Sequence, residues 1–191
     1  MLDNLKKYNV VLASNSPRRR ELLAGLGVDF TVHTIKGLDE SYSDDLPRHQ
    51  VAAYLSQKKA HAYTLSPDEL IITADTIVLA DGEVMGKPAD RDEAYRMLSK
   101  LAGATHEVIT GVTVATRDRQ ETFSNVTRVT FAPLTDDEIY HYIDNYRPFD
   151  KAGAYGIQEW IGYMGVTGIE GCFYNVMGLP VNHLYTVLKT F

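Results

Sequence analysis

The chain has a single cysteine and no long apolar run, and each absence excludes a class of protein. With Cys172 as the one cysteine among 191 residues, no disulfide can form within the chain. A disulfide-stapled domain is therefore excluded, and a reducing compartment, the cytoplasm, is expected. No stretch approaches the roughly 18 apolar residues that a membrane-spanning helix needs, and the N-terminal apolar run is too short for a signal peptide. The sequence therefore predicts no membrane association.

Several catalytic signatures are missing as well. The six histidines are scattered, without the His-Glu-x-x-His spacing of zinc enzymes. The glycine-flanked serine of α/β-hydrolases and the glycine-rich fingerprint of dinucleotide-binding domains are also absent. These absences exclude three common enzyme classes.

Positive charge is scarce overall and concentrated at one place. Lysine and arginine number 19 against 25 aspartates and glutamates, so the net charge is -6. This balance argues against broad nucleic-acid binding, which needs a basic face. The local exception is a run of three arginines, Arg18 to Arg20.

The order of the expected elements predicts an α/β protein with a mixed sheet flanked by helices. Strands are expected at 10–13, 30–35, 71–79, 106–118 and 121–133, the last two as a hairpin. Helices are expected at 17–27, 47–65, 89–103, 135–146 and 180–191. Asp81-Gly82 predicts a tight turn. The length suits one domain over residues 1–191, or two small lobes that share a core.

The segment from Ser14 to Arg19 is the first candidate site. A strand ends in a polar turn, and Ser16 is expected to cap a helix that begins at Pro17. The free N–H groups of a helix start, the Ser14 and Ser16 hydroxyls and two guanidiniums suit a phosphate. The same residues fit, equally well, a capped helix with solvated arginines.

Asp75 is the second candidate, because it interrupts the apolar strand 71–79. A carboxylate in a buried strand costs several kcal/mol unless it is paired or bound to metal. It is therefore either a metal ligand or general base, or a structural aspartate paired with a neighbouring arginine or the backbone.

Two lysines are further candidates, each with a plain alternative. Lys87 lies between Gly86 and Pro88, a rigid turn that suits a phosphate clamp. Turns of this sequence are common without such a role. Lys59 shares a helix face with Leu55 and is directed toward protein, where it either reaches a ligand or extends past the core.

An acidic pair and a late loop complete the candidates. Asp39-Glu40 either binds a hard cation together with Asp75 or is simply solvated. In the segment 151–158, small residues surround Gln158, whose amide offers the paired donor and acceptor that read a nucleobase. A loop without function is the alternative.

The motifs occur in an order that resembles the Maf family, named for septum-formation inhibition. They are Ser14-Asn15-Ser16-Pro17-Arg18-Arg19, Asp39-Glu40, Lys59-Ala60, Ala74-Asp75-Thr76, Gly86-Lys87-Pro88, Thr110-Gly111-Val112, the segment 150–158 and Gly178-Leu179-Pro180. The resemblance spans about residues 9 to 190.

The resemblance implies a nucleoside triphosphate pyrophosphatase that cuts between the α- and β-phosphates. It implies the fold of the inosine-triphosphate pyrophosphatases, with an elongated mixed sheet and two lobes around a central cleft. It also implies a divalent cation (Mg²⁺ or Mn²⁺), a cytoplasmic location and a homodimer. The sequence of segment 152–158 resembles the subgroup that acts on dTTP and UTP.

Roles for individual residues follow from the resemblance and from charge. The resemblance makes Asp75 the proton acceptor, and it relates Arg18, Thr76 and Gln158 to base choice. Charge predicts that Ser14, Ser16, Arg18 and Arg19 hold phosphates, with Lys59 and Lys87 at the leaving diphosphate. Glu40 and Asp75 are the expected metal ligands.

Two positions depart from the family pattern, and one rival function remains. Glu159-Trp160 stands where many relatives have a glycine-containing turn, and Cys172 stands where a serine is expected. The rival is a non-enzymatic, nucleotide-binding regulator of cell division. Such a module needs Arg18 and Lys87 for the anion but has no use for Asp75.

Overall fold

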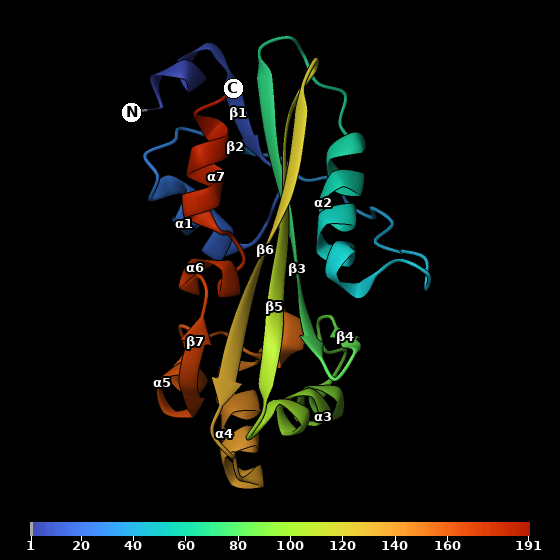
Figure 1. Ribbon diagram of the computed structural model, residues 1–191, viewed down its shortest axis with the longest axis vertical. Helices are drawn as coiled ribbons and strands as arrows, with labels where there is room; N and C mark the ends of the chain where they lie inside the picture. Colours follow the sequence, from blue (N-terminus) through green and yellow to red (C-terminus); the bar gives the residue numbers. More distant parts are fainter. Residues whose placement is uncertain (1) are drawn as a thin grey trace. The chain divides into compact units, whose positions relative to one another are not determined.

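A computed structural model describes residues 2–191, and its strands form one mixed sheet (Figure 1). The strands are β1 (Asn9–Leu12), β2 (Thr31–Val32), β3 (Glu69–Ala80), β4 (Glu83–Met85), β5 (Thr105–Thr116), β6 (Gln120–Phe131) and β7 (Val166–Glu170). Their order is β2-β1-β3-β5-β6-β7, with β4 paired to β3. β1 runs parallel to β2 and β3, whereas β4 and β7 are antiparallel to their partners. The predicted α/β class with a mixed sheet is confirmed.

The contacts of the chain divide it into two compact units, each with its own core. The first contains the described residues up to Asp75, then Thr110–Asn125 and Gly178–Phe191. The second contains Thr76–Ile109 and Val126–Met177. Strands β3, β5 and β6 therefore each contribute residues to both units.

The first unit packs helices against its part of the sheet. Its helices are α1 (Pro17–Ala24), α2 (Val51–His61) and α7 (Val181–Leu188), with short 3-10 turns at Asp3–Lys7 and Arg48–Gln50. Leu23 of α1 and Leu188 of α7 join Leu12 and Ile72 of the sheet in one core without solvent exposure. Burial of these aliphatic side chains supplies the main stabilisation of the unit.

The strand predicted over 30–35 and the helix predicted over 47–65 are the elements of the first unit that differ most from expectation. Both residues of β2 are exposed, so this strand has no apolar face to extend it, and the strand predicted over 30–35 keeps two residues. The helix predicted over 47–65 begins as a 3-10 turn and ends at His61. There the N–H of Tyr63 bonds to the carbonyl of Ala60 in a tighter turn.

A glycine lets α2 lie directly on β5. A Cβ atom at Gly111 would fall 2.3 Å from the backbone carbon of Ala52, so only glycine fits there. The Oγ atom of Ser56 lies 3.0 Å from Oγ1 of Thr113, and Oγ1 of Thr73 donates to the Ser56 carbonyl at 2.6 Å. These contacts fix the helix that carries Lys59.

The second unit is built on the helices α3 (Arg91–Leu101), α4 (Asp136–Tyr146), α5 (Trp160–Gly165) and α6 (Phe173–Val176), with a 3-10 turn at Ala152–Ala154. Leu98, Phe131 and Tyr142 are among the buried residues of its core. The predicted turn at Asp81-Gly82 is confirmed, since β4 pairs back on β3 from it. Thr135 and Glu138 form a capping box at the start of α4.

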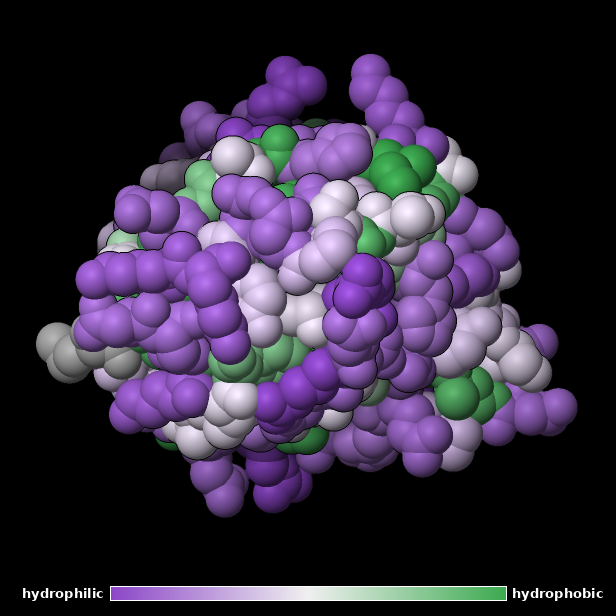
Figure 2. All heavy atoms as spheres, turned by 90° about the horizontal axis from the view of Figure 1, so that it is seen from above, coloured by the Kyte–Doolittle hydropathy of each residue, from purple (hydrophilic) through white to green (hydrophobic). Residues whose placement is uncertain are grey.

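The surface is mostly polar, as expected for a chain whose apolar side chains lie in internal cores. On the face in Figure 2 the described residues are mostly hydrophilic, and hydrophobic ones appear in small separate groups. Within residues 2–191, no helix is long and apolar enough to cross a bilayer.

Candidate active site

The predicted turn between β1 and α1 has the expected capped geometry. Ser16 is the N-cap, and its Oγ atom accepts the N–H of Arg19 at 3.4 Å. Pro17 is the first helical residue. The Ser14 Oγ atom accepts the N–H of Ser16 at 3.2 Å. The turn is therefore held by its own serines, with the positive end of the helix dipole at its centre.

Arg19 is fixed beside β3 by the backbone. Its Nε atom donates to the carbonyl of Gly178 at 2.8 Å, and its Nη1 atom donates to the carbonyl of Ala74 at 2.9 Å. Burial lowers the pKa of this guanidinium, an effect that the nearby charge of Asp75 opposes. Arg19 therefore ties α1 to the strand and places a positive charge near Asp75, while its contact with phosphate stays a prediction.

The other two arginines of the run differ from Arg19. Arg18 is half-buried in the first turn of α1. Arg20 is exposed, and its Nη2 atom donates to Oδ1 of Asn15 at 3.2 Å. The run therefore contains two half-buried arginines, of which Arg19 is bound to backbone carbonyls, and one surface arginine.

Asp75 is paired with a lysine. Its side chain is 14% exposed, between the buried residues Ala74 and Ile77 of β3. The ammonium of Lys59 contacts Oδ2 of Asp75 and lies 3.0 Å from Oε1 of Glu40. The carboxylate in the strand thus has a compensating charge of the kind that its burial requires, from Lys59 of α2, with the Arg19 guanidinium also near enough to interact with it.

The acidic pair Asp39-Glu40 is bound to a pair of lysines. Lys58 donates to Oδ2 of Asp39 at 2.8 Å, while Lys59 binds Glu40. The Ser41 hydroxyl also donates to Asp39 at 2.8 Å. Lys58 and Ser41 hold the pKa of the exposed Asp39 carboxyl well below its usual range. The sequence analysis did not identify Lys58, although two adjacent lysines can pair one to one with two adjacent acids, as Lys58 and Lys59 do here.

The donor set at Lys59 fits a hard cation. Carboxylate oxygens of Glu40 and Asp75 converge on one ammonium, and oxygen ligands are what Mg²⁺ and Mn²⁺ prefer. Among residues 2–191, no cluster of three or more histidine, cysteine or acidic side chains could hold a metal alone. Mg²⁺ commonly binds one or two carboxylates together with substrate phosphates. These residues therefore suit a cation that binds together with a nucleotide.

The remaining predicted residues belong to the second unit. Thr76 follows Asp75 on β3 and is half-buried. Lys87 is exposed after β4, in a turn where the carbonyl of Gly86 accepts the N–H of Gly153 at 3.0 Å. The predicted fixed turn at Lys87 is thus attached to the segment that leads to Gln158.

Gln158 lies in a tight turn. The N–H of Glu159 donates to the carbonyl of Gly156 at 3.0 Å and closes the turn around it. The Gln158 side chain is half-buried, and its Oε1 atom is buried without a hydrogen-bond partner in the described part of the chain. An unused buried acceptor is costly, so a partner from a ligand or a water molecule is expected for this atom.

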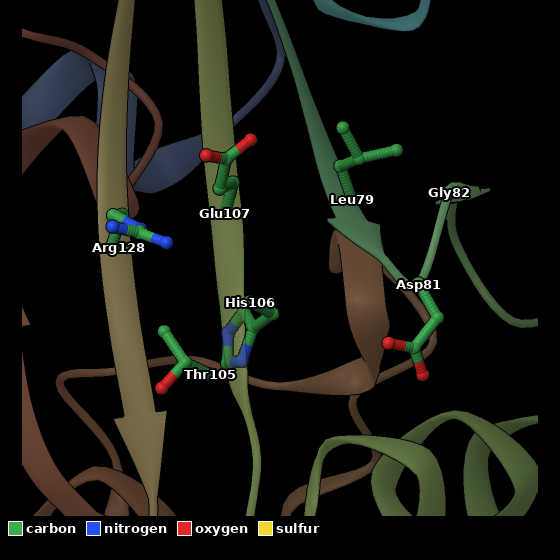
Figure 3. Close-up of a pocket in the computed structure, with 7 residues that line it drawn as sticks. All are labelled: Leu79, Asp81, Gly82, Thr105, His106, Glu107 and Arg128. Atoms are coloured by element: carbon green, nitrogen blue, oxygen red, sulfur yellow. The ribbon is translucent and has the colours of Figure 1, made fainter.

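A shallow pocket of about 190 Å³ in the second unit contains none of the predicted site residues (Figure 3). Its lining consists of Leu79, Asp81, Gly82, Thr105, His106, Glu107 and Arg128. His106 is a core residue whose Nε2 atom lies 2.7 Å from the Tyr155 hydroxyl, and burial lowers the pKa of its imidazole to about 4. Acids and an arginine of opposite charge share the pocket, so no single ligand charge is favoured.

A HAM1 protein from Coxiella burnetii has a similar structure, with a TM-score of 0.50 and 12% identity over 96% of this chain and 100% of the other. At that identity the likeness shows the fold, which is of the type that the resemblance implied.

Residues 9–191 match the Maf family, under the description "Maf-like protein". The chain belongs to this family. A relative from Phocaeicola vulgatus, named dTTP/UTP pyrophosphatase, is 59% identical over 191 residues, covering 99% of each chain. A relative of the same name from Parabacteroides distasonis is 58% identical over 193 residues and the full length of both.

Proposed function

We propose that this chain hydrolyses dTTP and UTP to the nucleoside monophosphate and diphosphate. The names of its close relatives support the substrates. The observation that carries the chemistry is the carboxylate of Asp75, which lies in a buried strand between Lys59 and the fixed charge of Arg19. A carboxylate in this position can accept a proton from water, while the neighbouring cations stabilise the negative charge on the phosphates.

In the proposed reaction, Asp75 accepts a proton from a water molecule. The water oxygen bonds to the α-phosphorus, and the bond from that phosphorus to the bridging oxygen breaks. The diphosphate departs with the bonding electrons and the negative charge. We assign Lys59 and Lys87 to the neutralisation of this negative charge.

Phosphate binding is assigned to the turn before α1. The Ser14 and Ser16 hydroxyls, the start of the helix and Arg18 offer hydrogen-bond donors and positive charge. Arg19 contributes its charge from a fixed position, because backbone carbonyls already hold its Nε and Nη1 atoms.

A divalent cation, Mg²⁺ or Mn²⁺, is assigned to Glu40 and Asp75. When bound, such a cation polarises a phosphoryl oxygen and makes the phosphorus easier to attack. Lys59 contacts one oxygen of each carboxylate, so a cation would use their other oxygens or displace the ammonium toward the phosphates.

Base selection is assigned to Thr76 and Gln158, following the resemblance. The carboxamide of Gln158 can donate and accept at once, which suits the edge of a pyrimidine. The half-buried side chain and its unpartnered Oε1 atom support this assignment.

The direct test is a panel of nucleoside triphosphates incubated with the protein and Mg²⁺ or Mn²⁺, with diphosphate release as the readout. Release from dTTP and UTP, with much less from CTP and purine nucleotides, is expected. Release from purine nucleotides alone would contradict the substrate assignment, and no release from any nucleotide would contradict the activity.

A further inference from the structure

Gln158 is held in a turn whose two ends bind the same hydroxyl group. The turn runs from Gly156 to Glu159 and is closed by their backbone hydrogen bond of 3.0 Å. The Tyr142 hydroxyl accepts the N–H of Gly156 at 3.0 Å and donates to Oε2 of Glu159. One side chain from α4 therefore fixes the first and last residues of the turn.

Tyr142 is suited to this anchoring role. It is a fully buried core residue, so the position of its ring is set by packing. Its hydroxyl is protonated at neutral pH, and burial together with the adjacent Glu159 carboxylate raises its pKa further. Its bond to Glu159 is charge-assisted and for that reason strong.

Lys151 occupies the other oxygen of Glu159. Its side chain is only 9% exposed, and its Nζ atom lies 3.1 Å from Oε1 of Glu159 and 2.7 Å from Oδ1 of Asp150. A buried ion pair of this kind adds little net stability compared with apolar residues. Its clearest effect is geometric, because both carboxylate oxygens of Glu159 now have fixed partners.

The turn also has no free space on its inner side. A Cβ atom at Gly156 would lie 2.9 Å from Cδ of Glu159, 3.0 Å from Nε2 of Gln158 and 3.0 Å from Cε of Lys151. The backbone is thus in close contact with the anchoring side chains and with the Gln158 amide itself. A small movement of the turn would move or rotate that amide.

Orientation of the amide matters for pyrimidine choice. Uracil and thymine present an N–H donor at N3 beside a carbonyl acceptor at C4, whereas cytosine presents an acceptor at N3 beside an amino donor. A glutamine amide in one orientation matches the first pattern, and the same amide turned by half a revolution matches the second. Discrimination therefore requires that the amide be held in one orientation.

We propose that Tyr142 and Glu159, supported by Lys151, are positioning residues that hold the Gln158 turn and so favour uracil and thymine over cytosine. The proposal rests on the proposed function, because it assumes that Gln158 contacts the base. None of the three residues needs to touch the substrate.

The test compares kcat/KM for UTP with that for CTP in Tyr142→Phe, which removes one hydroxyl and keeps the ring. The ratio is expected to fall about tenfold, the effect of one lost hydrogen bond, through a higher KM for UTP with kcat nearly unchanged. Tyr146→Phe, one turn further along α4 on an exposed tyrosine, is the matched control and should leave the ratio unchanged. Glu159→Gln provides a second variant that keeps the side-chain volume, with folding of each variant checked by circular dichroism.

A double variant separates positioning from general destabilisation. If Tyr142 acts through Gln158, then Tyr142→Phe should not change the ratio further once Gln158→Ala is present. An unchanged ratio in folded Tyr142→Phe and Glu159→Gln, with a lowered ratio in Gln158→Ala, would overturn the proposal and leave the proposed function intact. Wild-type protein that does not hydrolyse UTP would instead refute the function on which the proposal rests.

Discussion

Each unit contains a lysine whose ammonium lies between two carboxylates, and the two clusters differ in what else holds them. In the first unit Lys59 contacts Asp75 and Glu40, and the Glu40 side chain is 56% exposed on a loop. In the second unit Lys151 contacts Asp150 and Glu159, and Glu159, 20% exposed, is also bound by Tyr142. Each cluster thus has one exposed carboxylate, since Asp150 is 57% exposed, and one largely buried carboxylate, since Asp75 is 14% exposed. They differ in the third group, which is the nearby charge of Arg19 in the first cluster and the core hydroxyl of Tyr142 in the second.

This difference matches the roles that we assign. A reaction centre has to replace its internal ion pairs with substrate and cation, so a partly exposed cluster is useful there. A turn that presents an amide to a base has to stay in place, so a carboxylate held by both a lysine and a core hydroxyl is useful there. The same combination of residue types therefore serves two purposes, depending on which further side chain acts on its buried carboxylate.

The largest expected effect is that of Asp75→Asn. The amide cannot accept the proton of the attacking water, so kcat for UTP should fall by about a thousandfold or more. Nucleotide binding, measured by isothermal titration calorimetry, should remain. Asp39→Asn is the control, because that side chain is exposed and bonds to Lys58 and Ser41. Near-normal turnover by Asp75→Asn would show that the Asp75 carboxylate is not required for the reaction.

The next largest effect is expected on the free energy of unfolding, which should respond differently to loss of the lysine in each cluster. Lys151→Met leaves the Glu159 carboxylate without its cation in a largely buried place, and we expect a loss of about 3 kcal/mol in the free energy of unfolding. Lys59→Met removes the same kind of cation, but Glu40 is 56% exposed and Asp75 stays near the charge of Arg19, so the loss should be smaller, about 1 kcal/mol. Urea denaturation of both variants measures the difference. Equal losses would show that the charge of Arg19 does not compensate Asp75 when Lys59 is removed.

Cation binding gives the smallest expected effect. In the chain without nucleotide, Lys59→Met removes the ammonium that occupies the oxygens of Glu40 and Asp75. Mn²⁺ should then bind about tenfold more tightly, the effect of one competing charge at a partly exposed site, as measured by electron paramagnetic resonance of free Mn²⁺. Lys58→Met, which releases only Asp39, is the control. Weaker Mn²⁺ binding in Lys59→Met would contradict the assignment of the cation to these acids.

The sequence predicted the local parts of the site. Ser16 and Pro17 define a helix start by their own chemistry, and Asp75 is conspicuous within an apolar strand. The structure confirms the capped helix and the paired carboxylate. The hairpin at Asp81-Gly82 was predictable for the same reason, since turn residues act over short distances.

Contacts between distant segments could not be predicted. Arg19 binds the carbonyl of Gly178, which is 159 residues away, and no local pattern indicates that partner. Tyr142 lies on a helix face that reads as ordinary core, so its bond to Glu159 depends on how α4 packs. The roles of Ser14, Lys87 and Gln158, the homodimer and the single cleft stay predictions.

The most direct measurement of the central claim is hydrolysis of UTP in water labelled with heavy oxygen, by wild-type protein and Asp75→Asn, with mass spectrometry of both products. Attack at the α-phosphorus with Asp75 as proton acceptor predicts that the label enters UMP and that Asp75→Asn forms almost none. Label in the diphosphate, or labelled UMP formed at the wild-type rate by Asp75→Asn, would contradict it.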